Sequence, residues 1–161
     1  MRFFTYLRTG EEFKGRKKNY PDLLLNFAAG NQFSQRGIEQ DDLVYIWSFI
    51  KGHLYLLGRM QVEDIYTELD VKRLHPQIAN NYTFWASEHI VAVAGSATTP
   101  HFDLEVPADV INQLRFAGNK APKRKNTPLS NDFDPQTFRG VRELMPSSAS
   151  LLDKILKAHC A

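Results

Sequence analysis

A chain of 161 residues is long enough for one domain with a sizeable buried core. Its 43% hydrophobic and 24% charged residues are typical of a globular protein, and its longest apolar runs are too short to span a bilayer. The net charge of +2 does not by itself indicate a partner, the single cysteine, Cys160, excludes an internal disulfide, and no signal peptide is visible. We therefore expect a cytoplasmic protein that does not bind membranes.

The N-terminal segments predict a strand and then a helix. Residues 2–7 are rich in aromatic and apolar side chains, which favours a strand. The charged residues 11–19 are expected to form a loop. Pro21 is suited to the first turn of a helix, and Gly30 is suited to its end, so we expect a helix between them.

A β-hairpin is predicted in the middle of the chain. Leu43–Trp47 and Leu54–Met60 are apolar runs separated by a short segment that contains Gly52. Because side chains alternate along a strand, the first run is apolar on both faces. We therefore expect these two strands at the centre of a sheet rather than at its edge.

The segments after the hairpin alternate between short helices and short strands. We expect a helix over 66–74 and strands over 82–85, 90–94 and 102–106.

The last third of the chain is predominantly helical in pattern. A helix is expected from Pro107, followed by a long basic loop over 116–131. Asp134 and Pro135 resemble an N-cap and the first residue of a helix that extends to Leu144, and a final helix covers 147–156. The predicted fold is a single α+β domain over 1–161, a curved five- or six-stranded, mostly antiparallel sheet or barrel, with C-terminal helices 134–158 packed on it.

The hairpin also carries a resemblance to a known family. The run Leu-Val-Tyr-Ile-Trp at 43–47 and the run Leu-Tyr-Leu-Leu-Gly-Arg-Met-Gln-Val at 54–62 resemble the PUA-like superfamily, within it EVE and EVE-like domains. The segments 106–116, 138–144 and 148–156 resemble the tail of EVE-like modules from modification-dependent restriction systems. The chain departs from the pattern twice: residues 40–42 are Gln-Asp-Asp where the family usually has Gly-Asp, and it lacks the cage tryptophan that precedes the hairpin in EVE and YTH domains.

The resemblance implies a nucleic-acid-binding module without catalysis of its own. It would recognise a modified base, a methylated or hydroxymethylated cytosine in DNA, by flipping that base into an aromatic pocket within a restriction or defence system. A nuclease would be a further domain or subunit. The alternatives are an RNA reader, a small ASCH-type enzyme that acts on RNA or a nucleotide, and a protein-interaction module.

Two tryptophans are the candidate walls of the base pocket, because every base offers a π-face for stacking. The predicted pocket residues are Trp47, Trp85, Tyr45, Tyr82, Ser48 and Asn26, with the tyrosines at the rim and the last two reading the base edge. The alternative is that both tryptophans fill the core.

Basic clusters are the candidate phosphate contacts. Residues 110–131 hold five cations and no acid, and a second cluster lies over 14–18. The predicted phosphate-binding residues are Lys17, Lys18, Lys120, Lys123, Arg124 and Lys125. The alternative is that both clusters are solvated loops. No motif for nucleophilic catalysis or for a phosphate loop is present, and we expect no cofactor and no metal, since the histidines lack ligand spacing.

Overall fold

Two long strands from the predicted hairpin form the centre of the sheet. In the computed structural model, which describes residues 1–80, 86–125 and 133–160, β3 is Leu43–Ile50 and β4 is His53–Tyr66. The two turn residues, Lys51 and Gly52, both have positive φ (50° and 83°), which a two-residue hairpin turn requires. The hairpin prediction is confirmed. Both strands are longer than predicted, because their pairing continues up to the turn and because the far end of β4 pairs with a further strand.

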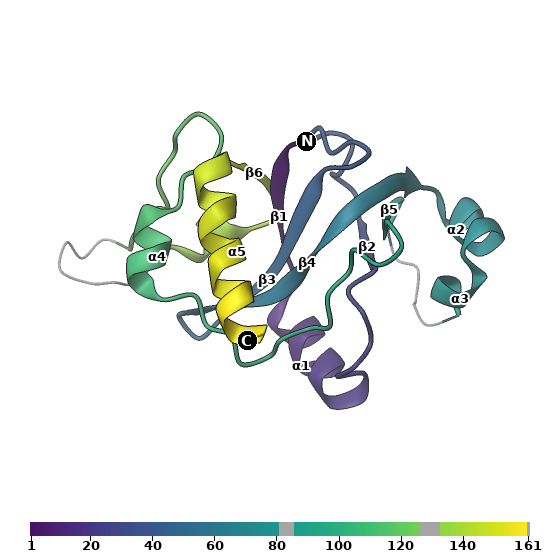
Figure 1. Cartoon of the computed structure of the whole chain (residues 1–161), viewed down its shortest axis with the longest axis horizontal. Coiled ribbons are helices and arrows are strands. Elements are labelled where there is room, and N and C mark those ends of the chain that lie inside the picture. Colours follow the sequence, from purple (N-terminus) through teal and green to yellow (C-terminus); the bar gives the residue numbers. More distant parts are fainter. Residues whose placement is uncertain (81–85, 126–132, 161) are drawn as a thin grey trace.

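The strands of the described residues form one mixed, six-stranded sheet in the order β2-β5-β4-β3-β1-β6 (Figure 1). The other strands are β1 (Phe3–Leu7), β2 (Phe27–Gly30), β5 (Glu88–Ala92) and β6 (Val141–Leu144), and β2 and β6 form the two edges. β1 runs parallel to β3, and the other neighbours are antiparallel. The predicted α+β class with a mostly antiparallel sheet is therefore confirmed.

Helices lie around the sheet in three places, the first of them occupied by the N-terminal helix alone. They are α1 (Gly10–Asn19), α2 (Glu68–Leu74), α3 (Pro76–Ala79), α4 (Ala108–Gln113) and α5 (Pro146–Cys160), with a short 3-10 helix, η1 (Pro135–Phe138). Figure 1 shows α2 and α3 together beyond β5, and α4 and α5 together on the side of β6. None of the described helices has the length and apolarity needed to cross a membrane.

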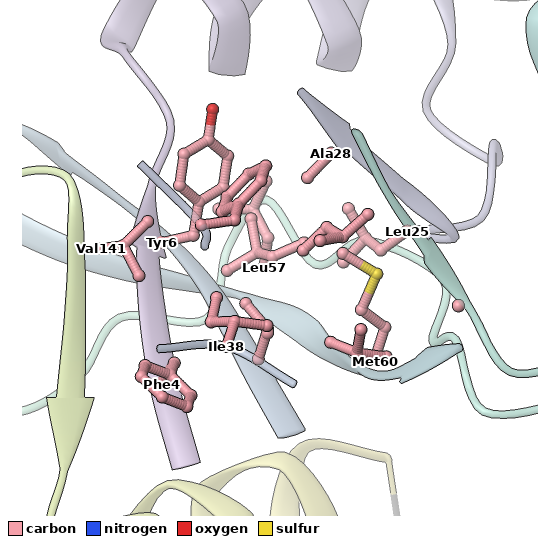
Figure 2. Packing of buried hydrophobic residues seen from close by; sticks show 14 of the residues in the cluster. Phe4, Tyr6, Leu25, Ala28, Ile38, Leu57, Met60 and Val141 are labelled. Carbon is pink, nitrogen blue, oxygen red and sulfur yellow. The ribbon is translucent and has the colours of Figure 1, made fainter. Parts of the chain in front are cut away.

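Buried side chains fill both faces of the sheet. Val44 and Ile46 of β3 belong to an inner cluster that also contains residues of β1, β2, β4 and β6, and Figure 2 shows its side chains pointing into one interior. Tyr45 and Trp47 belong to a second cluster, with residues of α4 and α5. The prediction that β3 is apolar on both faces is confirmed.

The sheet curves so strongly that side chains from β1 and from the residue after it reach β2, although three strands separate β1 from β2 in the sheet. The hydroxyl of Tyr6 donates to the carbonyl of Ala29 at 2.6 Å, and Arg8 Nη2 donates to the carbonyl of Phe27 at 3.0 Å. Both donors come from β1 or the residue after it, and both acceptors lie on β2, which is not a neighbour of β1 in the sheet. The sheet is therefore curved but not closed by backbone pairing.

The prediction of a loop over 11–19 is wrong, because α1 occupies this stretch. Thr9 caps the helix by accepting a hydrogen bond from the Glu12 amide at 3.1 Å. The acids lie in the first turn and the bases in the last turn, which suits the helix dipole. Buried Phe13 then fixes the helix to the core.

Two predicted helices are wrong because tertiary pairing makes their residues strands. Phe27–Gly30 pairs with β5, so the expected helix from Pro21 does not form. The helix expected from Pro135 ends after one turn as η1, since Gly140 has φ of +64°. β6 follows and pairs with β1.

Three of the predicted helices form, and one of the predicted strands does not. The helices over 66–74, after Pro107 and over 147–156 are confirmed as α2, α4 and α5. Residues 102–106 form no strand, only a bridge between Tyr55 and Glu105. The strand expected over 82–85 lies outside the described residues.

Candidate nucleic-acid interface

A cationic cavity of about 800 Å³ lies beside β6, η1 and the loop before residue 126. It is lined by Arg36, Lys120, Ala121, Lys123, Asp134, Gln136, Thr137, Arg139 and Arg142. Five of these residues are lysine or arginine, and one is an acid. Such a concentration of positive charge on a concave surface attracts polyanions.

The pairing of β6 places Arg142 in the wall of this cavity. Its neighbours Val141 and Leu144 are buried, whereas Arg142 lies opposite Thr5 and reaches the cavity. The guanidinium lies over the ring of Phe116 and donates from Nη1 to the carbonyl of Thr137 at 2.6 Å. These two contacts hold the guanidinium plane in one orientation before any ligand binds.

The basic loop is attached to η1 through Thr137. The Lys123 amide donates to Thr137 Oγ1 at 2.9 Å, and the Asp134 amide donates to the carbonyl of Lys123 at 2.9 Å. Thr137 is itself buried. The position of Lys123 at the cavity is thus fixed by backbone hydrogen bonds.

The positive charge of the cavity is not neutralised by the described carboxylates. None of them forms an ion pair with Arg36, Lys120, Lys123 or Arg139. Asp134 uses Oδ1 to accept from the Gln136 amide at 3.0 Å, which caps η1. Burial, and then the charge of Arg36, lower the pKa of Arg142 from its usual value, although an arginine keeps its proton at neutral pH.

A smaller pocket of about 290 Å³, which we call the glycine-walled pocket, is lined in part by Gly140 and Val141, which lie in the chain between Arg139 and Arg142 of the cationic cavity. It is lined by Tyr6, Leu7, Thr9, Glu12, Gly30, Asn31, Gln32, Phe33, Gly140 and Val141. A further hollow, which shares Arg36, Lys120 and Arg142 with the cationic cavity, also reaches Val141. A chain that crosses the cationic cavity could therefore place one group in the glycine-walled pocket.

The two glycines of this pocket lie so close to neighbouring side chains that a larger residue would displace them. A Cβ on Gly30 would lie 2.9 Å from the Phe33 ring, and a Cβ on Gly140 would lie 3.4 Å from Gln32 Oε1. Tyr6 and Phe33 meet edge to face, with centroids 5.3 Å apart, beneath the pocket. Asn31 and Gln32 are both exposed. Asn31 Oδ1 already accepts from the Ser87 amide at 2.9 Å and from the Ser87 hydroxyl at 3.1 Å, so Asn31 offers its NH₂ group to a base edge, whereas the Gln32 amide can both donate and accept.

The structure brings two of the predicted phosphate-binding residues to the cavity. Lys120 and Lys123 line it, and both are exposed, as are Arg124 and Lys125. Arg124 instead bonds to Asn112 Oδ1 and lies over Phe133, 5.7 Å from the ring centroid.

The other predicted phosphate contacts lie elsewhere on the fold. Lys17 and Lys18 are exposed near the C-terminal end of α1 and do not line this cavity. Their predicted contact with phosphate stays a prediction.

The base pocket predicted around Trp47 does not fit the structure. Trp47 and Tyr45 are fully buried, in the cluster between β3, α4 and α5. The indole meets Phe138 edge to face at 5.5 Å, and the Tyr45 hydroxyl donates to Asp153 Oδ1 at 3.0 Å. A ring without exposed surface cannot stack on a base, so these two residues belong to the core.

The remaining predicted pocket residues are dispersed. Ser48 is buried and donates to the carbonyl of Arg8 at 2.9 Å. Asn26 lies at a different pocket, beside β5. Trp85 and Tyr82 lie outside the described residues.

Three cations of the cavity were not predicted from the sequence: Arg36, Arg139 and Arg142. Arg139 and Arg142 lie in a stretch for which the sequence pattern predicts a helix. Had Val141–Leu144 been interpreted as a strand, its alternation would have placed Arg142 on the face opposite Val141.

Comparisons with known proteins give the chain no family. No family model and no curated protein matches it. A hypothetical protein from Leishmania major is similar in structure, with a TM-score of 0.49 and 9% identity over 100% of this chain and 98% of that one. A mutant of the ZmASCH protein from Zymomonas mobilis has a TM-score of 0.43 and 10% identity over 96% of each chain. Scores of this size assign neither a family nor a function.

Proposed function

We propose that the protein is a nucleic-acid-binding module, which holds backbone phosphates in the cationic cavity. The observation that carries the proposal is the meeting of five cations at one cavity, without a carboxylate partner among the described residues for four of them. Phosphate contacts of lysine and arginine supply most of the affinity in such complexes. The proposal leaves catalysis to another domain or subunit.

The proposal includes one unstacked base in the glycine-walled pocket. Gln32 and Asn31 offer donors and acceptors at its rim, and the neighbouring cationic cavity would hold the phosphates on either side of the base. Base extrusion costs a few kcal/mol, and the phosphate contacts would offset that cost. Stacking on Trp47 cannot do so, because the indole is fully buried.

The finer part of the proposal is that the base is a modified cytosine in DNA. It rests on the sequence resemblance to EVE-like domains. An RNA ligand has the same phosphate chemistry, so the test compares both polymers.

The test is a fluorescence-anisotropy panel of labelled single-stranded RNA, single-stranded DNA, and duplex DNA with cytosine, 5-methylcytosine or 5-hydroxymethylcytosine. We expect nucleic-acid binding that is lost in a Lys120→Ala, Lys123→Ala, Arg139→Ala triple variant. Lys72→Ala with Arg73→Ala and Lys154→Ala is the matched control, because it removes equal charge from α2 and α5. Equal losses in both triple variants, or no binding to any probe, would overturn the proposal.

Discrimination of the base is tested separately with Gln32→Ala. Loss of one hydrogen bond to the base should weaken binding of the preferred probe about 2- to 10-fold while the other probes keep their affinity. Gln35→Ala, an exposed glutamine three residues further along the chain, is the control. If Gln32→Ala weakens all probes equally or none of them, the base does not enter the glycine-walled pocket.

A further inference from the structure

A second pocket, which we call the β5 pocket, lies at the other end of the sheet and differs in chemistry from the cationic cavity. It has a volume of about 300 Å³, within the range of small-molecule sites. Most of its wall is aliphatic, from β5, the segment after it and α3, with Leu24, Ile78 and Val93 among the residues. No lysine or arginine is found among the described residues that line it.

Glu63 provides the charged group of this pocket. Its Oε1 accepts from the Tyr66 hydroxyl at 2.6 Å and lies 3.3 Å from His75 Nε2. Both contacts use the same oxygen, so Oε2 has no hydrogen-bond partner within the part of the chain that the structure describes. The carboxylate is held in place by two side chains and keeps one oxygen for a ligand.

The Tyr66 hydroxyl is a lasting donor to Glu63. Burial, and then the hydrogen bond to Glu63, raise the pKa of Tyr66 to about 12. The phenol therefore keeps its proton at neutral pH and continues to donate to Glu63 Oε1.

A second acceptor of the β5 pocket is also unfilled. Asn26 Oδ1 is buried and has no hydrogen-bond partner among the described residues. Buried polar atoms are nearly always paired, and an unpaired one often indicates a group that is absent from the structure. Both unused atoms, Asn26 Oδ1 and Glu63 Oε2, are acceptors, so a ligand that suits this pocket would be a donor.

We propose that the β5 pocket binds a small organic amine, with a protonated amino group at Glu63 and a compact apolar body against the aliphatic wall. An ammonium group supplies the donors and the positive charge that these acceptors require. β5 is separated from β6 by three strands of the sheet, so this ligand and a polyanion in the cationic cavity occupy different ends of it. The proposal is independent of the nucleic-acid function.

The experiment titrates the ¹⁵N-labelled full chain with benzylamine and follows amide chemical shifts. Benzyl alcohol, a neutral molecule of the same shape, and benzoate, an anion, are the comparison probes. We expect benzylamine to give saturable shifts at Val93, Ala94 and Gly95, with benzyl alcohol at least about tenfold weaker and no shift from benzoate at these residues.

Two variants locate the binding group. Glu63→Gln removes the charge at nearly constant shape and should weaken benzylamine at least about tenfold. Asp64→Asn removes the same charge from the next residue, outside the pocket lining, and should leave the affinity unchanged.

Three results would overturn the proposal: no saturable shift with benzylamine, equal affinity for benzyl alcohol, or unchanged affinity in Glu63→Gln. If Glu63→Gln fails to fold, the comparison of benzylamine with benzyl alcohol on the unaltered chain decides the question.

Discussion

The guanidinium carbon of Arg142 lies 3.6 Å from the centroid of the Phe116 ring. A planar cation on an aromatic face is fixed in orientation, and its free edge can meet phosphate oxygens in pairs. Lysine keeps the charge but has neither the plane nor the paired donors. We therefore expect Arg142→Lys to weaken nucleic-acid binding about tenfold, a loss of about 1.4 kcal/mol.

Anisotropy titrations and thermal melting together check this expectation. The melting temperature should fall only slightly, because Arg142 is half-buried and the substitution keeps its aliphatic stem. Lys154→Arg on the exposed face of α5 is the control for arginine–lysine exchange. Full affinity in Arg142→Lys would show that charge alone suffices at this position.

The salt dependence of binding reports the number of phosphates that the cavity neutralises. For duplex DNA, removal of Lys120 and Lys123 together should reduce the slope of log K against log salt by about 0.9 for each phosphate that is no longer neutralised. Arg124→Ala should change the slope less, since Arg124 is engaged with Asn112 and Phe133. Affinities measured at several salt concentrations give the slopes, and an unaltered slope in the double variant would mean that the loop is only solvated.

Trp47 is expected to act on stability and not on recognition. The indole is fully buried and packs edge to face on Phe138 and Phe116. Trp47→Ala should therefore lower the free energy of unfolding by about 3–5 kcal/mol in urea denaturation. The milder Trp47→Phe should fold and keep the affinity for every nucleic-acid probe. A change in the preference among probes would show that Trp47 takes part in binding the base.

Stability should fall at alkaline pH because of Tyr66. Its pKa is raised to about 12, by burial first and then by Glu63, so the folded chain keeps a proton that the unfolded chain releases at about pH 10. This contribution is fully present below about pH 10 and is lost as the pH rises to about 12. Burial likewise raises the pKa values of Tyr6 and Tyr45, which adds to the decline.

Urea denaturation at a series of pH values from about 8 to about 12 checks this expectation. Tyr66→Phe should show a shallower decline than the unaltered chain, whereas Tyr20→Phe, at an exposed ring, should show the same decline. Equal declines in all three proteins would mean that Tyr66 has no preference for its protonated form in the fold.

Local signals were sufficient for part of the fold. The hairpin of β3 and β4 combines apolar alternation with a Gly52 turn, and α5 has an apolar face at helical spacing, so both were predictable. β2 is different: it has four residues, and its partner β5 lies far along the chain. Pairing of this kind overrides local propensity and leaves no local pattern.

The candidate site was predictable only where its cations are clustered in the sequence. Lys120 and Lys123 belong to such a cluster, whereas Arg36 lies far from β6 in the chain and meets Arg142 only in the folded sheet. Trp47 shows the converse limit. The sequence predicts which face of the strand Trp47 lies on. It does not predict that α4 and α5, which come much later in the chain, cover that face.

The contacts of Tyr6 and Arg8 with the carbonyls of β2 bear on how open this edge of the sheet is to a strand from another molecule. β2 is an outer strand, and Phe27 and Ala29 would offer their carbonyls to a strand from another molecule. A phenol and a guanidinium from the same chain already bind these acceptors. They occupy the acceptors without continuing the backbone ladder, so the curvature that forms the inner core also makes this edge of the sheet a poorer template for a strand from a neighbouring molecule.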